Sequence, residues 1–455
     1  MKATLRTVRL DLTEPLRISR STMSARDAVW LTIEHDGLYG CGEAVSSVYY
    51  GLDAATLERL LAATDVTRFT DPESALEALR AGEFAGADTA PAVTAAVEAA
   101  LLDLVGKRAD SPVHRLLGAV APPVAATART IGITSPTRAA AEARRLAASG
   151  FEIIKVKAGA RDPEEDVERV RVIRDAAPGA RLLLDPNGAW SAAQATSLLP
   201  RYADLGVEAV EQPLAPGDPE ALGALAERSP LPVIADEDAV NLEDARRLAG
   251  RVHGVNVKLA KCGGVHAALR IAALIEGSGT ELMLGCLTAS SLGLAPAVHL
   301  ADRARWADLD GHLLLAHDPW TGIGGTDGFV RATDAPGLGV RLRDRATDVP
   351  HAEGPPQERA PDAPGFGEAR PQERTPDTRG ARPRNRATDA PGLDEARRQD
   401  TPNAPVPPQG RAPDSPGLQA PPQDRTPHAP GVPPQHRTPD ATGVRPREVV
   451  HEDVA

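Results

Sequence analysis

The stretch EIIKVK at residues 152–157 opens a series of five short apolar runs, each of which ends in a charged residue. The series continues with RLLLD at 181–185, VEAVE at 207–211, PVIAD at 232–236 and GVNVK at 254–258. Segments with helical spacing of apolar residues separate the runs, whose last residues lie 22 to 28 positions apart. Strands that alternate with helices in this way predict parallel β–α–β units.

Three further runs extend the series on both sides. TARTIGI lies at 127–133, ELMLG at 281–285 and RWADLD at 305–310, which brings the total to about eight strands, the number of a closed α/β barrel. We favour a (β/α) barrel over an open doubly wound sheet, because no glycine-rich phosphate-binding motif follows the first strand. The periodicity taken alone also permits the open sheet.

The chain outside the barrel differs from it in composition. Residues 1–120 combine strand-like alternation with an Ala- and Leu-rich helical portion, which predicts an α+β domain. Residues 121–330 hold the barrel and 331–340 form a closing segment. Residues 341–455 contain 23 of the 42 prolines, repeats of the RATDAPG type and one aromatic residue, Phe366. Because such a segment has too little apolar surface to offset its ordering entropy, we predict a disordered tail.

Charge and cysteine content restrict the class of protein. The net charge is −12, and −11 of it lies in residues 1–340, with 34 Lys and Arg against 45 Asp and Glu. Neither nucleic acid nor an anionic membrane is therefore expected as a partner. The three cysteines are scattered without ligand spacing, as reduced thiols would be. No signal core and no long apolar run is present, which predicts a cytoplasmic protein.

Lysine is rare in this chain. Six lysines leave 45 arginines among the 51 basic residues, and four of the six form two tight pairs, Lys155 with Lys157 and Lys258 with Lys261. Arginine stays protonated in proteins, whereas a lysine amine can lose its proton and act as a base. In a chain that otherwise uses arginine for positive charge, we interpret the two pairs as candidates for catalysis rather than as solvated surface pairs.

Three carboxylates, Asp185, Glu211 and Asp236, end the three runs between the lysine pairs. Side chains at the C-terminal ends of barrel strands meet at one mouth of the barrel, where the mutual repulsion of three acids favours a bound divalent cation. A small set of oxygen ligands suits Mg²⁺. Asp185 and Asp236 each precede a helix and could singly be N-caps. Three acids flanked by lysine pairs favour the metal site.

These parts together indicate proton transfer next to a carboxylate. A metal bound to a substrate carboxylate stabilises the enediolate that forms when the adjacent carbon loses its proton. One lysine can remove that proton, and a lysine on the opposite side of the barrel can return it to the other face of the carbon. Two opposed bases indicate a racemase or epimerase. One base with a facing cation would equally serve a β-elimination or a cycloisomerisation.

Six motifs follow one another in a recognisable order: GCGEAVSSVYYG at 40–51, then KVKAG, LLLDPNGAW, VEQPL, VIADED and NVKLAKCGG. With these motifs the chain resembles the muconate-lactonizing subgroup of the enolase superfamily over residues 3–340. The resemblance implies an enolase-type modified TIM barrel, with the N-terminal α+β residues as a capping domain. The loops of that domain near 16–26 and 46–51 would supply specificity.

The resemblance also implies roles for the residues at the barrel mouth. The three strand-end acids would bind one Mg²⁺ per subunit. Lys157 and Lys258 would be the paired acid–base catalysts, while Lys155 and Lys261 would assist electrostatically. Asn187 would orient a ligand.

One further motif favours a branch within the subgroup. Asp308 and Asp310 resemble the DxD signature of the dipeptide epimerases, where the pair binds the α-ammonium group of the substrate's N-terminal residue. This implies inversion of the α-carbon of the C-terminal residue of a dipeptide such as L-Ala-D/L-Glu. Arg20 would pair with a substrate carboxylate. The alternative is that the two aspartates simply end a strand and cap the barrel. The sequence departs from the family pattern at Ala289, where relatives commonly have Glu, and this departure concerns the detail of the substrate pocket.

Several rival hypotheses keep the site and change the substrate: N-acylamino acid racemase, o-succinylbenzoate synthase and muconate cycloisomerase. Asp308 and Asp310 discriminate against these rivals, because neither an N-acylated nor an all-carboxylate substrate offers an ammonium group. A hypothesis of another class is a catalytically inactive scaffold whose tail binds partners, against which the intact lysine and acid set argues. We expect a small-molecule substrate and a homo-oligomer.

Overall fold

The computed structural model describes residues 1–84 and 90–344. All of these residues lie within one compact unit, which therefore holds both the N-terminal domain and the barrel. The predicted tail lies outside the described residues from position 345 onward. No helix in the described part of the chain is long and apolar enough to cross a membrane.

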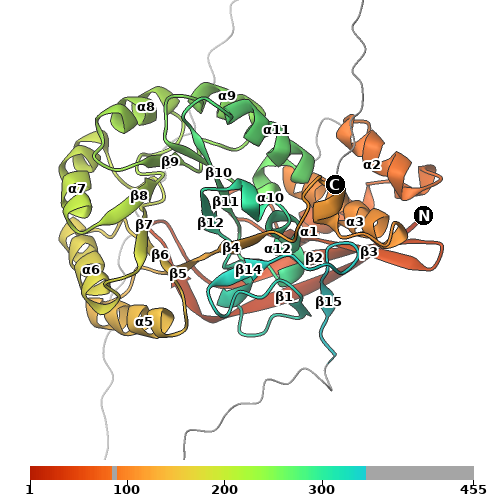
Figure 1. Cartoon of the computed structure of the whole chain (residues 1–455), viewed down its shortest axis with the longest axis horizontal. Coiled ribbons are helices and arrows are strands. Elements are labelled where there is room, and N and C mark those ends of the chain that lie inside the picture. The colour runs from red at the N-terminus through yellow and green to blue at the C-terminus, as the bar shows by residue number, and fades with distance from the viewer. Residues whose placement is uncertain (85–89, 345–455) are drawn as a thin grey trace, which may run out of the picture. The chain divides into compact units, whose positions relative to one another are not determined.

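The barrel is a sheet of eight parallel strands in which each strand pairs with its neighbour in the sequence. The helices that follow the strands lie on the outside of the sheet (Figure 1). The strands are β5 (Ala128–Ile131), β6 (Ile153–Lys157), β7 (Arg181–Asp185), β8 (Val207–Glu211), β9 (Val233–Ala235), β10 (Gly254–Val257), β11 (Glu281–Gly285) and β12 (Trp306–Asp308). The helices are α5 (Pro136–Ala148), α6 (Pro163–Ala176), α7 (Ala192–Asp204), α8 (Pro219–Arg228), α9 (Leu242–Leu248), α10 (Leu259–Cys262), α11 (Val265–Ile275) and α12 (Ser291–Val298). The predicted enolase-type barrel is confirmed.

Side chains close the barrel where β12 meets β5, since the described sheet ends at these two strands. The Leu309 amide donates to Thr127 Oγ1 at 2.8 Å, and the Thr130 amide donates to Asp310 Oδ2 at 2.7 Å. Asp310 therefore takes part in closing the barrel, in addition to any role at its mouth.

The inside of the barrel is apolar at one end and charged at the other. Alternate residues of a strand face the same side, so Ile153, Lys155 and Lys157 of β6 all face inward. Ile153 packs with apolar residues of other strands, among them Trp306, which donates its Nε1 hydrogen to Glu208 Oε1. Above this apolar layer, the inward positions carry the charges of the mouth.

The N-terminal domain consists of an antiparallel sheet covered by helices. Its strands are β1 (Lys2–Arg17), β2 (Thr22–His35) and β3 (Leu38–Val45), and its helices are α1 (Ala54–Ala62), η1 (Val66–Arg68), α2 (Pro72–Arg80), α3 (Pro91–Arg108) and α4 (Val113–Leu116). Helix α3 lies directly against β3 because Gly40 and Gly42 have no side chain there. A Cβ at Gly42 would lie 2.0 Å from the Ala96 carbonyl oxygen. The predicted α+β capping domain is thus observed.

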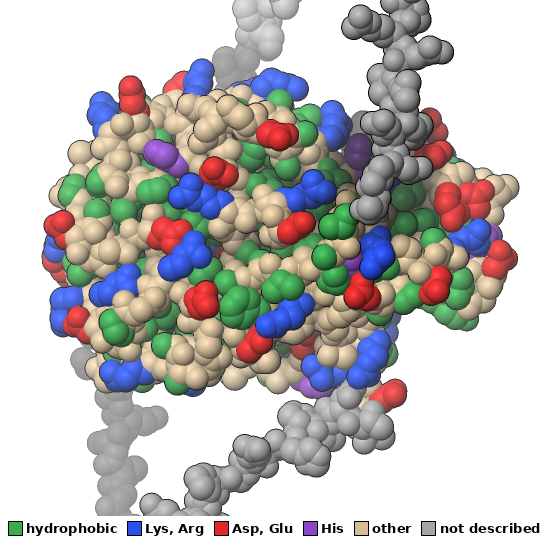
Figure 2. All heavy atoms as spheres, in the orientation of Figure 1, with side chains coloured by type: hydrophobic (Ala, Val, Ile, Leu, Met, Phe, Trp, Pro, Cys, Tyr) green, Lys and Arg blue, Asp and Glu red, His purple; other side chains and the backbone are tan. Residues whose placement is uncertain are grey.

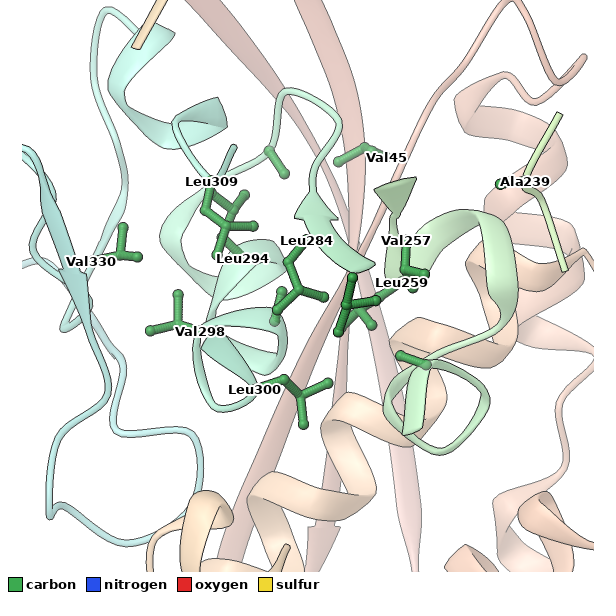
Figure 3. Close-up of a cluster of buried hydrophobic side chains, with 14 of the residues drawn as sticks. Val45, Ala239, Val257, Leu259, Leu284, Leu294, Val298, Leu300, Leu309 and Val330 are labelled. Carbon is green, nitrogen blue, oxygen red and sulfur yellow. The ribbon is translucent and has the colours of Figure 1, made fainter. Parts of the chain in front are cut away.

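A single core joins the two domains. Val45 of β3, Val257 of β10 and Leu294 of α12 belong to one cluster of buried apolar side chains, which Figure 3 shows at the junction of these elements. Because this cluster contains residues from both domains, the N-terminal domain is packed against the barrel as part of the same folded body.

Short elements complete the described chain. They are β4 (Val124–Ala126), η2 (Ala301–Arg303), η3 (Gly311–Leu314), β13 (Trp320–Thr321), β14 (Phe329–Arg331) and β15 (Arg341–Leu342). Strand β14 pairs with β4 and β15 pairs with β13. Regular structure therefore continues to Leu342, just past the predicted start of the tail at residue 341. On the face shown in Figure 2, acidic and basic side chains are interspersed.

Candidate active site

A cavity of about 470 Å³ lies at the C-terminal ends of the barrel strands and extends to the N-terminal domain. The barrel contributes the charged strand ends, including Lys155, Lys157, Lys258 and Asp308. The N-terminal domain contributes the turn between β1 and β2 and the loop that follows β3. The structure thus brings the residues predicted from separate strands into one place, under the two loops predicted to supply specificity.

Lys155 lies at the centre of the acids. Its Nζ is 2.5 Å from Glu211 Oε2, 2.7 Å from Asp308 Oδ2 and 3.1 Å from Asp185 Oδ2, and its side chain is 1% exposed. Burial alone would lower the pKa of Lys155, but the charges of Asp308, Glu211 and Asp185 outweigh it and raise that pKa well above its usual value. Lys155 is therefore a cation held among three carboxylates in this arrangement.

Lys157 and Lys258 differ from the other two lysines in being partly exposed to the cavity. Their side chains are 11% and 12% exposed, against 1% for Lys261. Lys157 Nζ contacts Asp185 Oδ2, and Lys258 Nζ donates to Asp236 Oδ2 at 2.7 Å. The first extends from the end of β6 and the second from the residue after β10, so the two amines approach the cavity from strands four positions apart in the eight-stranded sheet.

Lys261 holds Asp236 in place from behind. Its Nζ donates to Asp236 Oδ1 at 2.5 Å, to the Asp236 carbonyl at 2.6 Å and to the Asn256 carbonyl at 3.0 Å. Burial would raise the pKa of Asp236, but the charges of Lys258 and Lys261 outweigh it and hold that pKa well below its usual value. Lys261 is thus placed to support a carboxylate and has no exposed path to a substrate.

The three strand-end acids are almost completely buried and differ in charge balance. Burial opposes ionisation of Asp185, yet Lys157 and Lys155 lower its pKa to about 2. At Glu211, burial and the charge of Asp185 prevail over Lys155 and raise the pKa to about 8. Glu211 is therefore the acid whose charge the surrounding lysines compensate least.

The chemistry of these acids fits a hard divalent cation. As they lie, no three His, Cys, Asp or Glu side chains among the described residues converge closely enough to hold an ion, because lysine ammonium groups lie between the acids. The donors are nonetheless all oxygens from the adjacent strands β7 and β8 and the residue after β9. Buried Asn187 Oδ1 accepts no hydrogen bond, while Glu211 Oε2 is paired with the Lys155 ammonium. An all-oxygen donor set of this kind suits Mg²⁺.

Two residues orient the acids through their unusual backbone. Asn187 and Gln212 both have positive φ, 50° and 38°. Asn187 donates its amide to Asp185 Oδ1 and its Nδ2 hydrogen to Asp185 Oδ2. Gln212 Oε1 accepts from the amides of Asp236 and Asp238. Gln212 was absent from the sequence prediction, and its place directly after Glu211 was the only signal for it.

Asp308 and Asp310 both line the cavity but have different partners. Asp308 Oδ2 accepts from Lys155, and its buried Oδ1 accepts no hydrogen bond. Asp310 Oδ2 accepts from the Thr130 amide at 2.7 Å and from Arg129 Nη1 at 3.3 Å. Asp308 thus keeps an oxygen for a ligand, whereas one oxygen of Asp310 already closes the barrel.

Arg20 reaches the barrel from the turn between β1 and β2. Its Nη1 lies 2.7 Å from Glu237 Oε1 and donates to the Asn187 carbonyl at 3.1 Å, and its guanidinium lies over the ring of Tyr49 at 4.5 Å. The charge of Arg20 is thus balanced by Glu237, a residue that sequence analysis passed over. Arg20 lines the cavity, but its guanidinium is paired with groups of the protein itself.

Ala289 lies behind the mouth. It is buried, and it borders a separate cavity of about 50 Å³ that Glu43 also lines. Glu43 accepts hydrogen bonds from Trp30 Nε1, the Ser290 amide and Ser290 Oγ. The larger cavity is lined at this point by Thr288. Ala289 therefore lies at the junction of the two domains, and its small cavity shares Lys258 and Cys286 with the larger one.

An eight-stranded barrel whose strand ends carry lysines and carboxylates, beneath an N-terminal α+β domain, defines the enolase type of protein. Comparison of the sequence with family models agrees. Residues 1–118 match the N-terminal domain of the mandelate racemase/muconate lactonizing enzyme family, and residues 138–346 match the enolase C-terminal domain-like family. The chain belongs to the mandelate racemase/muconate lactonizing enzyme family of the enolase superfamily, and it is an isomerase.

Several of the relatives that the chain resembles are named dipeptide epimerases. The chain is 31% identical to the L-Ala-D/L-Glu epimerase of Bacteroides thetaiotaomicron, with 75% of this chain and 88% of the relative covered. It is 33% identical to the hydrophobic dipeptide epimerase of Roseobacter litoralis, with 74% and 98% covered. The crystal structure of the dipeptide epimerase from Enterococcus faecalis, complexed with Mg and the dipeptide L-Leu-L-Tyr, superposes with a TM-score of 0.70 at 31% identity, covering 74% of this chain and 98% of that one.

Proposed function

We propose that this protein is a Mg²⁺-dependent dipeptide epimerase that inverts the α-carbon of the C-terminal residue of its substrate. One observation carries the proposal. Lys157 and Lys258 are the two lysines of the mouth with exposed area, and they reach the same cavity from strands four positions apart. Relatives that are named dipeptide epimerases support the choice of substrate class.

The two lysines would act on opposite faces of one carbon. With the α-carbon of a dipeptide between them, one amine takes the α-proton and the other ammonium returns a proton from the far side. Lys155 would assist electrostatically, as a fixed positive charge among the acids of the mouth. Asp185, Glu211 and Asp236 would hold Mg²⁺, whose charge stabilises the negative charge that develops on the substrate carboxylate.

Asp308 would recognise the other end of the dipeptide. Asp308 lines the same cavity as the lysines, and its buried Oδ1, which has no hydrogen-bond partner, would accept a hydrogen bond from the α-ammonium group of the N-terminal residue. Asp310, held by Thr130 and Arg129, would add negative charge beside it. An N-acylated substrate has no ammonium group to offer, so this pair favours a dipeptide over an N-acylamino acid.

The activity can be tested with a library of L,L-dipeptides incubated in D₂O with Mg²⁺ and analysed by mass spectrometry. We expect deuterium at the α-carbon of the C-terminal residue only, together with formation of the L,D product. N-succinyl amino acids are the comparison substrates. Deuterium in those compounds with none in any dipeptide would refute the epimerase assignment and point to an N-acylamino acid racemase.

The metal site can be tested without activity. We expect Mg²⁺ to raise the melting temperature of the protein and to bind with a stoichiometry of one in isothermal titration calorimetry. Glu211→Gln removes the least compensated acid, so both effects should disappear in this variant. The matched substitution Glu208→Gln, on the same strand but bonded to Arg181 and Trp306, should leave Mg²⁺ binding intact.

A further inference from the structure

The cavity contains one cation without a counter-ion. The described charged side chains that line it are Arg20, Arg26, Lys155, Lys157, Asp236, Glu237, Lys258, Asp308 and Asp310. All but Arg26 have an oppositely charged partner within 4.0 Å among the described residues. An unpaired charge that is withdrawn from water is costly, so a protein usually retains it for a ligand.

Arg26 is held in position by neutral groups. It lies on β2, where its Nη1 donates to the Ser46 carbonyl in the loop after β3 and its Nη2 donates to Met23 Sδ at 3.2 Å. Its buried Nε has no hydrogen-bond partner. Burial lowers the pKa of Arg26 to about 10 against a smaller opposing effect of the Cys286 thiol, and the guanidinium is still charged at neutral pH.

The edge of this guanidinium formed by Nε and Nη2 matches a carboxylate. Nε and Nη2 lie side by side on the planar group and can donate two parallel hydrogen bonds to the two oxygens of one carboxylate. Met23 covers this edge with a thioether, which is a weak acceptor on a flexible unbranched side chain. A carboxylate that displaces the sulfur would replace one weak hydrogen bond with two charge-assisted ones.

We infer that Arg26 recognises an anionic side chain on the C-terminal residue of the dipeptide, and so makes the enzyme selective for dipeptides that end in an acidic residue. This inference rests on the proposed dipeptide epimerase activity. Under that proposal Mg²⁺, held by the three acids, binds the α-carboxylate, and Asp308 binds the α-ammonium group. The remaining anion of an acidic dipeptide is its side chain, and Arg26 on the capping domain faces the same cavity.

The test compares two nearly isosteric substrates, L-Ala-L-Glu and L-Ala-L-Gln, with wild-type protein and with Arg26→Met. We expect wild type to prefer Glu. A hydrogen-bonded charge pair is worth about 1.5–3 kcal/mol, so Arg26→Met should lower kcat/KM for Glu by about 10- to 100-fold, mainly through KM. For Gln, kcat/KM should change little. Arg9→Met is the matched control, because Arg9 lies on β1, is exposed and pairs with Asp11.

The outcomes separate the two proposals. If wild type exchanges Gln and Leu dipeptides as fast as Glu, or if Arg26→Met lowers kcat/KM equally for Glu and Gln, the role of Arg26 is refuted while the epimerase activity stands. If wild type exchanges no dipeptide, the proposed function fails and this inference fails with it. The melting temperature of Arg26→Met, together with its activity on L-Ala-L-Leu, shows whether the variant is folded.

Discussion

The two partly exposed lysines of the mouth should be individually essential. General acid–base groups contribute about 10²- to 10⁴-fold to a rate, so Lys157→Ala and Lys258→Ala should each reduce epimerisation at least about 100-fold. Each variant retains the base on one side only, and should exchange the α-proton of one enantiomer while losing exchange of the other. Mass spectrometry with the separate L,L and L,D dipeptides in D₂O measures this.

Lys2→Ala serves as the control for this pair, since Lys2 is exposed at the start of β1. Wild-type activity in either Lys157→Ala or Lys258→Ala would refute the two-base mechanism. Equal loss of exchange for both enantiomers in both variants would show that the lysines act as a unit rather than as bases for opposite faces.

Asp308 should discriminate between free and blocked amino termini. We expect wild type to prefer a dipeptide over its N-acetyl derivative, and Asp308→Asn to lose about 10- to 100-fold of that preference, the value of a hydrogen bond to a charged group. The preference is the ratio of the two kcat/KM values, so any general effect of disturbing Lys155 cancels. If this ratio stays unchanged in Asp308→Asn, Asp308 does not bind the α-ammonium group of the substrate.

Single residues show how far the sequence could predict the site. The strand-end lysines and acids were predictable because strand periodicity and barrel geometry bring strand ends together wherever the rest of the chain lies. The sequence could not predict that Arg20 pairs with Glu237, or that Arg26 has no acidic partner among the described residues. Both features depend on how the β1–β2 turn docks on a barrel loop more than 200 positions away, and periodicity carries no information about that contact.

At the scale of elements, the contact of α3 with β3 depends on the two glycines of the GCG motif, Gly40 and Gly42, which have no side chain. Gly42→Ala would place a Cβ 2.0 Å from the Ala96 carbonyl oxygen, so helix and strand must move apart. Overpacking of this kind costs about 1–3 kcal/mol, and the urea midpoint of unfolding should fall accordingly with an unchanged m-value. Gly179→Ala is the control, because nothing lies within 4 Å of a Cβ there. A midpoint equal to that of the control would contradict the close contact.

Elements were predicted well where one physical signal dominated. The apolar runs gave the barrel strands, although β9 and β10 end one residue earlier than predicted, before Asp236 and Lys258. These two residues lie in the loops that follow, where the side chain is free of the strand pleat. The seam between β12 and β5 was not predictable, because side chains close it and no strand pattern records them.

At the scale of the whole molecule, the capping domain and the barrel depend on each other through buried polar contacts as well as the shared core. Glu43 of β3 accepts two hydrogen bonds from Ser290 at the start of α12. At the other end of α12, His299 Nδ1 accepts from the His114 amide of α4, and its Nε2 lies 3.2 Å from the Leu338 carbonyl. One barrel helix thus binds the capping domain at both ends and the closing segment at one.

His299 should make the stability of this assembly depend on pH. Burial, which outweighs the hydrogen bond to Leu338, lowers the pKa of His299 from 6.5 to about 4 in the folded protein. Between these values the unfolded chain binds a proton that the folded protein excludes, so the stabilisation is complete above pH 6.5 and is lost as pH falls toward 4. The loss approaches about 3 kcal/mol below pH 4. We expect the free energy of unfolding in urea to fall more between pH 7.5 and 5 for wild type than for His299→Gln. Burial also lowers the pKa of the neighbouring His114. Because His114 is present in both proteins, its contribution to the pH dependence cancels in the comparison. Equal pH dependence in the two proteins would show that His299 is not a neutral link between capping domain, barrel and closing segment.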